Sequence, residues 1–197
     1  MSNARNLANL LGTGTTVPSS KLSLVSSDMP TGTVLQVKQT YITTAASYTG
    51  THGSPAATAL TASITPSSTS SKILIMIDAA FSSPGINHNH QFLKRTIGST
   101  TTDVGQATST SNRPASTGIQ SSQVSNLETD NENYDINHST VQFLDSPATT
   151  SEVTYKLHVG SYASATIYLN RTRSDRDNTG GYDARMTSSV LLMEIAG

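Results

Sequence analysis

Two histidines separated by a single residue, His88 and His90, have the residue type and spacing in this chain that best suit metal binding. In an extended strand, residues two positions apart point to the same side, so both imidazoles would share one face. Neutral imidazole nitrogens bind transition-metal ions. Because Pro84 and Gly85 lie just before the pair and favour a loop, the alternative is a solvent-facing pair of hydrogen-bonding side chains.

A second group of candidate ligands lies in the charged segment 171–185. Asp175–Gly180 has the spacing that begins a calcium loop, but Thr179 stands where Asp or Asn is needed and Met186 where a bidentate Glu is needed. We therefore interpret it as a turn. We expect the arginines to pair with the acidic residues across a hairpin; the alternative is that they bind acidic glycans. These residues are Arg171, Arg173, Arg176 and Arg185, with Asp175, Asp177 and Asp183.

The sequence contains no convincing catalytic group, so we expect no enzyme. Four carboxylates lie close together in an Asn-rich stretch that suits a loop, whereas a glycosidase fixes two of them across a cleft. They are Glu128, Asp130, Glu132 and Asp135. The many serines form no nucleophile elbow, and the absence of cysteine excludes a thiol nucleophile, a thiolate metal site and disulfides.

Composition restricts the partners. Charged residues make up 13% of the 197, with a net charge of -1, so no electrostatic field draws the chain to nucleic acid or to an anionic membrane. The hydrophobic share is 35%; with glycine counted in place of tyrosine it is about 38%, against roughly 45–50% in ordinary globular chains. A chain so poor in core-forming residues gains stability from oligomerisation.

The N-terminal part is the one segment with a helical pattern. Leu7, Leu10 and Leu11 fall at helical spacing within residues 2–11, and Gly12 ends the pattern. So short a helix is unstable alone, so its apolar side must dock on sister helices or on another protein. Residues 12–32 follow as an extended linker rich in Ser, Thr, Gly and Pro. We expect no signal peptide and no membrane insertion, since neither a basic and apolar leader nor a long apolar run is present.

From Thr33 onward the hydrophobic period changes to two. The clearest alternation is at 152–159, and further candidate strands lie at 58–64, 71–81, 91–97, 118–124, 140–144, 167–169 and 190–195. Eight or nine short strands without a helical period predict an all-β chain, an antiparallel sandwich of the jelly-roll kind, for a head domain at 33–197.

Two of these candidate strands are apolar on both faces. Ile73–Ile77 runs without a polar break, and Val190–Ile195 has the same character. Neighbouring strand residues point to opposite faces, so neither face can be left in water. Two such strands are hard to bury in one small sandwich, which suggests that they meet other copies of the chain.

Several sequence blocks resemble, in the expected order, the C-terminal head domains of tailed-phage fibre proteins, especially those of marine phages. The blocks are Ile64–Leu74, Phe143–Thr150, Thr154–Lys156, Asn170–Arg171 and Ser188–Ala196. The opening Ala4–Leu10 is also similar to N-terminal segments of such virion proteins. The resemblance covers about residues 33–197 and departs from long fibres in having almost no shaft.

The resemblance implies a homotrimer of heads shaped like those of tumour necrosis factor and complement C1q, attached to the particle by residues 1–32. Leu7, Leu10 and Leu11 would then make the attachment. The middle and last strands would lie beside the threefold axis, with Ile73, Ile75, Ile77, Leu191, Met193 and Ile195 at the trimer interface. In some fibres a His-X-His motif from three chains binds a metal on that axis, and His88 and His90 would be its ligands here; otherwise no cofactor is implied.

The function implied is that of a phage virion protein, a short tail-fibre or head-fibre head that binds the host surface through many weak contacts. Its partners would be itself, other virion proteins and a host glycan or protein. One alternative is a capsid-decorating protein held by its N-terminal segment. Another is a fibre-borne polysaccharide hydrolase or esterase.

Overall fold

The protein is an antiparallel β-sandwich. The computed structural model describes residues 25, 28–83, 88–109, 111–121 and 134–197, and these residues contain eleven strands and no α-helix. The strands are β1 (Val34–Ile42), β2 (Ala46–Thr49), β3 (Ala56–Ile64), β4 (Lys72–Ser82), β5 (His88–Ile97), β6 (Thr100–Val104), β7 (Gly118–Ser121), β8 (Asn137–Asp145), β9 (Val153–Ser161), β10 (Thr166–Leu169) and β11 (Ser188–Ile195). The predicted all-β antiparallel sandwich is confirmed.

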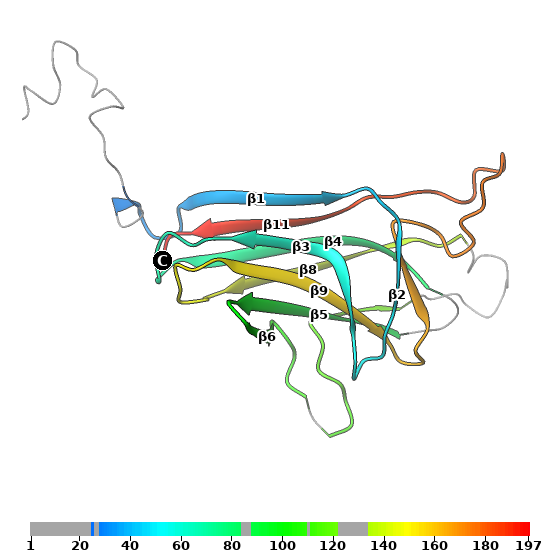
Figure 1. The fold of residues 1–197 in the computed structure, drawn as a ribbon, viewed down its shortest axis with the longest axis horizontal. Helices are drawn as coiled ribbons and strands as arrows, with labels where there is room; N and C mark the ends of the chain where they lie inside the picture. Colours follow the sequence, from blue (N-terminus) through cyan, green and yellow to red (C-terminus); the bar gives the residue numbers. More distant parts are fainter. Residues whose placement is uncertain (1–24, 26–27, 84–87, 110, 122–133) are drawn as a thin grey trace, which may run out of the picture.

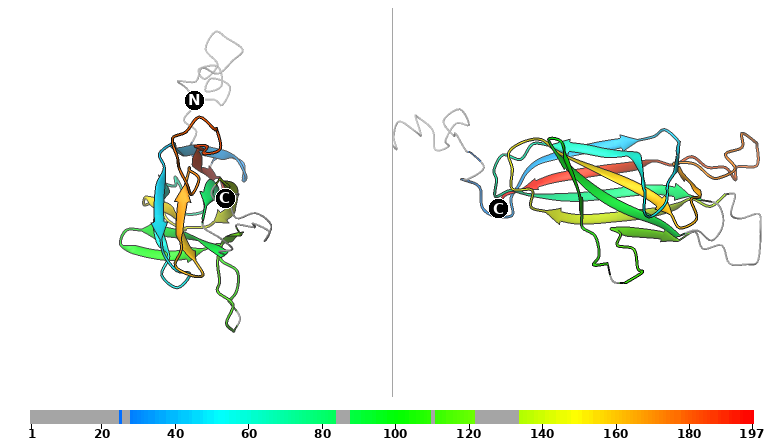
Figure 2. Two further views of the ribbon diagram at one scale, coloured as in Figure 1. Left: turned by 90° about the vertical axis from the view of Figure 1, so that its right-hand side faces the viewer. Right: turned by 60° about the horizontal axis from the view of Figure 1, so that its bottom comes forward.

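The strands form two sheets that lie face to face (Figure 1). In the first, called here the β4 sheet, the order is β1-β11-β4-β10-β2, and β8 pairs with the other side of β4. In the second, the β5 sheet, the order is β3-β9-β5-β6, and β7 pairs with β5 beside His88–Gln91. The long, narrow sandwich is seen from two further directions in Figure 2.

Alternation along the strands decides which side chains enter the space between the sheets. In β9, Val153, Tyr155, Leu157 and Val159 are buried, and Thr154, Lys156 and His158 between them are half-buried. The predicted period of two is therefore confirmed where it is clearest. The largest fully buried side chains of the core are Tyr155, Phe81, Leu60, Ile64, Ile73, Ile75, Ile77, Leu93, Leu157, Ile167, Leu169 and Leu192.

The position of β4 corrects part of the interface prediction. Ile73, Ile75 and Ile77 have between 0 and 1% of their surface exposed in the single chain. They belong to the core between the sheets and have no side-chain surface left for a second copy. The sequence pattern showed that both faces of this strand are apolar but did not show which face the other sheet covers.

A polar network crosses the sandwich at one end of the core. Arg95 Nη1 in β5 donates to both carboxylate oxygens of Asp145 in β8, at 2.9 Å each, and Tyr155 Oη in β9 donates to Asp145 Oδ2 at 2.7 Å. Burial, together with this hydrogen bond, raises the pKa of Tyr155, which stays a neutral donor. Because buried polar groups are costly unless paired, the three residues fix the two sheets in one relative position.

A second network fixes the turn after β10. Asn170 has a left-handed backbone with φ of 58° and is fully buried. Its amide nitrogen donates to the carbonyls of Ile42 and Thr44, and its Oδ1 accepts from Ser188 Oγ at 2.6 Å. Asn tolerates this backbone region better than most residues, which accounts for its place here.

Two predicted features are not covered by the description. The helix at 2–11 and most of the linker at 12–32 lie outside the described residues, so the domain division at residue 32 stays a prediction. The candidate strand at 118–124 is described as far as Ser121. The short strands β2 and β6 were not predicted.

Candidate interaction surface

The outer face of the β4 sheet carries a continuous apolar row. Strand register places Val37 beside Met193, Met193 beside Leu74, and Leu74 beside Leu144, so the row runs from β1 through β11 and β4 to β8. Val37 is 52% exposed and Leu144 is 48% exposed. In a single chain, the two ends of the row are therefore largely in water.

Rows on either side of the central row widen this face. Leu191 of β11 pairs with Met76 of β4 in the next row, and Ile195 lies beyond Met193 in the other direction. All three are half-buried. We call the set the outer apolar face: Val37, Leu74, Met76, Leu144, Leu191, Met193 and Ile195. The predicted interface residues of β11, Leu191, Met193 and Ile195, all belong to it.

Polar groups border the outer apolar face at both ends of the sheet. Beyond Met76 lie Asp78 and His138, with His138 Nδ1 2.9 Å from Asp78 Oδ1 and both side chains substantially exposed. At the other end, Lys72 pairs with Ile195 and is exposed. An apolar centre with a polar rim is the usual anatomy of a protein–protein interface, and contiguous exposed apolar patches mark interaction sites.

The two histidines of the proposed metal pair lie on β5, and both point to the outer side of the β5 sheet. His90 is 8% exposed, and the ring of His52 covers it at a centroid distance of 5.9 Å. Burial first, and then the neighbouring His52 and His88, lower the pKa of His90, so it is neutral at pH 7. Its Nδ1 has no hydrogen-bond partner.

The metal prediction and the interface prediction use opposite faces of the sandwich. His88 and His90 lie on the outer side of the β5 sheet, whereas Leu191, Met193 and Ile195 lie on the outer side of the β4 sheet. Within the described residues, no group of three or more His, Cys, Asp or Glu side chains is arranged to hold a metal. Because the two sets lie on opposite outer faces, a single threefold axis cannot pass close to both.

The charged segment after β10 forms a compact loop at the end of the sandwich opposite the C-terminus (Figure 1). Arg171 and Arg185 both pair with Asp175, at 2.9 and 2.7 Å, and Arg176 pairs with Asp183 at 3.1 Å. The predicted pairing across the hairpin is confirmed for these residues. Because Asp175 already accepts from two guanidinium groups, it is poorly placed to bind a cation.

Asp183 anchors this loop. Burial raises its pKa, but hydrogen bonds from Ser174, Thr172 and Arg176 outweigh burial and bring the pKa down to about 2. Arg176 also donates to Tyr134 and lies over its ring, 4.9 Å from the centroid. Tyr134 and Tyr182 pack together, and Tyr182 is 65% exposed. The loop thus presents tyrosine and arginine groups at the far tip of the molecule.

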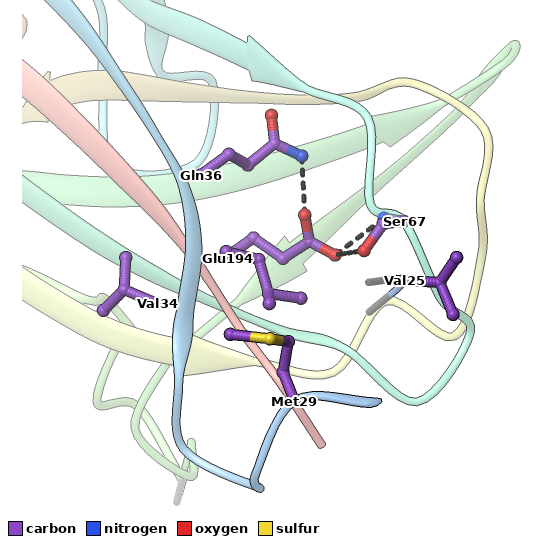
Figure 3. Close-up of a pocket in the computed structure, with 7 residues that line it drawn as sticks. Val25, Met29, Val34, Gln36, Ser67 and Glu194 are labelled. Atoms are coloured by element: carbon purple, nitrogen blue, oxygen red, sulfur yellow. Dashed lines mark hydrogen bonds between the residues drawn. The ribbon is translucent and has the colours of Figure 1, made fainter. Parts of the chain in front are cut away.

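Near the C-terminus, where the chain enters β1, lies a pocket of about 420 Å³ (Figure 3). It is lined by Val25, Met29, Val34, Leu35, Gln36, Ser67 and Glu194. Glu194 accepts hydrogen bonds from Ser67 N and Oγ and from Gln36 Nε2, each at 2.6 Å. This fully buried carboxylate ties β1 and the β3–β4 loop to β11.

Leu7, Leu10 and Leu11, the predicted attachment residues, lie outside the described residues, so their role stays a prediction. Sequence reasoning missed the half-exposed Val37, Leu74, Met76 and Leu144, because their grouping depends on strand register. The signal that pointed toward them was the two-sided apolar character of Ile73–Ile77 and Val190–Ile195.

No helix of the described part is long and apolar enough to span a membrane.

Comparison with known proteins gives little further information. No family model matches the chain, and no curated protein matches it. A chain in a solved structure of the Gt strain of infectious bursal disease virus is similar at 10% identity and a TM-score of 0.33, over 82% of this chain and 42% of that one. The present chain thus spans less than half of the viral chain. A TM-score this low carries no argument about shared fold or function.

Proposed function

We propose that this protein is a structural component of a virus particle, and that three copies associate through the outer apolar face to form a head that binds the host surface. The observation that carries the self-association is the row Val37, Met193, Leu74 and Leu144. Full burial of a large aliphatic side chain contributes about 1.5–3 kcal/mol. Burying this row against other copies of the chain therefore adds stabilisation that the low apolar content of a single chain cannot supply.

The resemblance of the sequence blocks to tailed-phage fibre heads supports both a trimeric assembly and a place for the protein in a virus particle. Binding to the host is supported by the loop at the far tip, where exposed Tyr182 and Arg176 are held on a network anchored by Asp183. Tyrosine side chains supply a large, rigid contact area at low cost in conformational entropy, and arginine is enriched at binding hot spots, so both suit contact with a sugar or protein surface. Three tips on one head raise avidity without requiring tight binding at each.

The self-association is tested by light scattering on the purified chain. We expect the native protein to have about three times the single-chain mass of 20.7 kDa. Val37→Lys and Leu144→Lys place charges at the two exposed ends of the row, and we expect them to lower the mass toward that of one chain. The control is Ile119→Lys, which changes a similarly exposed residue on the β5 sheet. A native mass of one chain at working concentration would refute the proposal.

The location on a particle needs a separate experiment. In an image reconstruction of a virus particle that contains the protein, a fibre head projects from the tail or capsid, whereas a decorating protein lies flat on the shell. We expect density for the sandwich to project with the loop at 171–185 outward. Density with that loop against the shell would contradict host binding and favour decoration.

A further inference from the structure

A groove on the outer face of the β5 sheet has the side chains of a site for anions. Its volume is about 380 Å³, and it crosses β3, β9, β5 and β6. Lys94, Lys156 and His158 line it, together with Ala57 and the hydroxyl-bearing Thr96, Thr101 and Thr154. This face is on the opposite side of the sandwich from the outer apolar face.

The two lysines of the groove are forced together by strand register. Lys94 of β5 pairs directly with Lys156 of β9, so both ammonium groups project from the same face of neighbouring strands. Like charges directly opposite one another are unfavourable in a sheet. Lys94 is compensated by Asp103 of β6, at 2.6 Å. Among the residues that the structure describes, Lys156 takes part in none of the ion pairs.

His158 adds a third nitrogen group to the same groove. Its Nδ1 lies 3.5 Å from the carbonyl oxygen of Pro55, and its ring is half-buried beside the lysines. Burial first, and then the charges of Lys94 and Lys156, lower its pKa, which the contact with Pro55 and the charge of Asp103 partly offset. A bound anion would oppose the effect of the lysines.

The threonines supply hydroxyl groups along one side of the groove. Thr96 and Thr101 bond to each other at 2.8 Å, and Thr154 bonds to Ser63 at 2.7 Å. A hydroxyl donates one hydrogen bond and accepts up to two, so these pairs keep capacity for a further polar ligand. Ammonium groups next to hydroxyls match the needs of an oxyanion attached to a hydroxyl-rich molecule.

We propose that this groove binds an oxyanion, a carboxylate, sulfate or phosphate group, with Lys156 as its principal partner and Lys94, His158 and the threonine hydroxyls around it. An acidic sugar and free inorganic phosphate share this chemistry. The proposal does not rest on the proposed function, because the groove faces away from the outer apolar face and would exist equally in a single chain.

The test is isothermal titration calorimetry of the full chain with sodium phosphate, sodium sulfate, glucuronate and, as a neutral comparison, glucose. We expect saturable binding of at least one of the three anions and none of glucose. Binding of glucuronate but of neither inorganic anion would identify an acidic sugar as the source of the anion, and binding of sulfate or phosphate without glucuronate would identify a free inorganic ion. No saturable binding of any of the three would overturn the proposal.

The variant Lys156→Gln separates the groove from general charge effects. Because Lys156 has no ion pair to lose among the described residues, the variant should fold normally, and we expect it to weaken anion binding about tenfold or more. The control is Lys38→Gln, which removes an exposed lysine from β1 of the other sheet. Equal affinity in Lys156→Gln and the native chain would also overturn the proposal.

A second readout follows the pKa of His158 by nuclear magnetic resonance, with its signal assigned by its loss in His158→Gln. We expect the bound anion to raise this pKa, and anion affinity to increase as the pH falls through it. The charged groups facing His158 are Lys94, Lys156 and Asp103. Saturation with anion that leaves this pKa unchanged would place the anion elsewhere and refute the site.

Discussion

Glu194 is a buried carboxylate stabilised by hydrogen bonds, since none of the ion pairs among the described residues includes it. Burial raises its pKa, but the donors on Ser67 and Gln36 outweigh burial, so the net pKa lies below the ordinary value of 4.5. A lowered folded-state pKa means that folding favours the ionised form. The stabilisation is therefore present above pH 4.5 and is lost as the pH falls through the lower folded-state value.

We predict that Glu194→Gln lowers the free energy of unfolding at neutral pH by about 1–3 kcal/mol, because an amide cannot accept all of the donors that a carboxylate accepts. In acid below the folded-state pKa, where the native carboxyl is also neutral, the difference should shrink. Urea unfolding at both pH values measures it. Glu152→Gln, at an exposed position, is the control. A difference that persists unchanged in acid would contradict this account.

The hydrogen bond from Tyr155 to Asp145 joins the two sheets, and removing it tests how much that link stabilises the fold. Tyr155→Phe removes one buried hydrogen bond to Asp145 but keeps the ring that packs in the core. We predict a loss of about 1–3 kcal/mol in the free energy of unfolding, since an acceptor is left with one donor fewer in a buried site. Tyr162→Phe, at a ring 72% exposed, should change the unfolding midpoint little. Equal effects of the two variants would show that the network does not link the sheets.

At the scale of single residues, the sequence predicted which side chains share a strand face, but it did not predict which groups contact them. His88 and His90 do share a strand face, as their spacing indicated. The partner that matters most for His90 is His52, which is 38 positions away and arrives through the loop before β3. The local sequence around His52 does not predict this contact, because the contact depends on the path that the loop takes through space.

That loop is held against β9 at a point where no side chain fits. A Cβ atom at Gly160 would lie 2.1 Å from the carbonyl oxygen of Thr51, and His52 N donates to the carbonyl of Ser161 at 3.2 Å. The close approach of two backbones requires glycine here. The loop can cover His90 only because position 160 has no side chain.

We predict that Gly160→Ala displaces the loop at residues 50–54 and costs about 1–3 kcal/mol of stability, as expected when an atom is forced into a packed site. The amide of Ser161, which donates to Gly50, should then exchange its hydrogen faster, and His90 should become more accessible. Gly53→Ala is the matched control in the same loop, because its Cβ would meet no atom within 4 Å. Unchanged exchange at Ser161 in Gly160→Ala would refute the prediction.

At the scale of strands, the strength of the apolar signal decided what could be predicted. The apolar runs became β4 and β11, and the alternation at 152–159 became β9. The strands β2 and β6 lie at sheet edges and were missed. In β2, Ala-Ser-Tyr-Thr, only two of the four residues are half-buried, and in β6, Thr-Thr-Thr-Asp-Val, four of the five residues are exposed. Such strands are specified by pairing with a neighbour, which a single sequence does not display.

At the scale of the whole molecule, the all-β sandwich follows from the period-two pattern and the absence of helical periodicity after residue 12. Which strands join which sheet does not follow from it. β4 and β9 have similar burial patterns on their inner faces, yet the outer face of β4 is apolar and that of β9 carries Thr154, Lys156 and His158. Only register across four strands shows that one outer face is suited to self-association and the other to polar ligands.

Coupling between assembly and stability gives the last prediction. If copies cover the outer apolar face, only the folded chain associates, so the melting temperature of the native protein should rise with protein concentration. Val37→Lys with Leu144→Lys should abolish this dependence and lower the melting temperature at high concentration toward the dilute value. Scanning calorimetry over a wide concentration range measures both effects. Because Val37 and Leu144 are half-exposed at the two sides of the sheet, a lysine there reaches water in the single chain and should not disturb the core. A native melting temperature independent of concentration, at a mass of one chain, would leave the outer apolar face for a different partner.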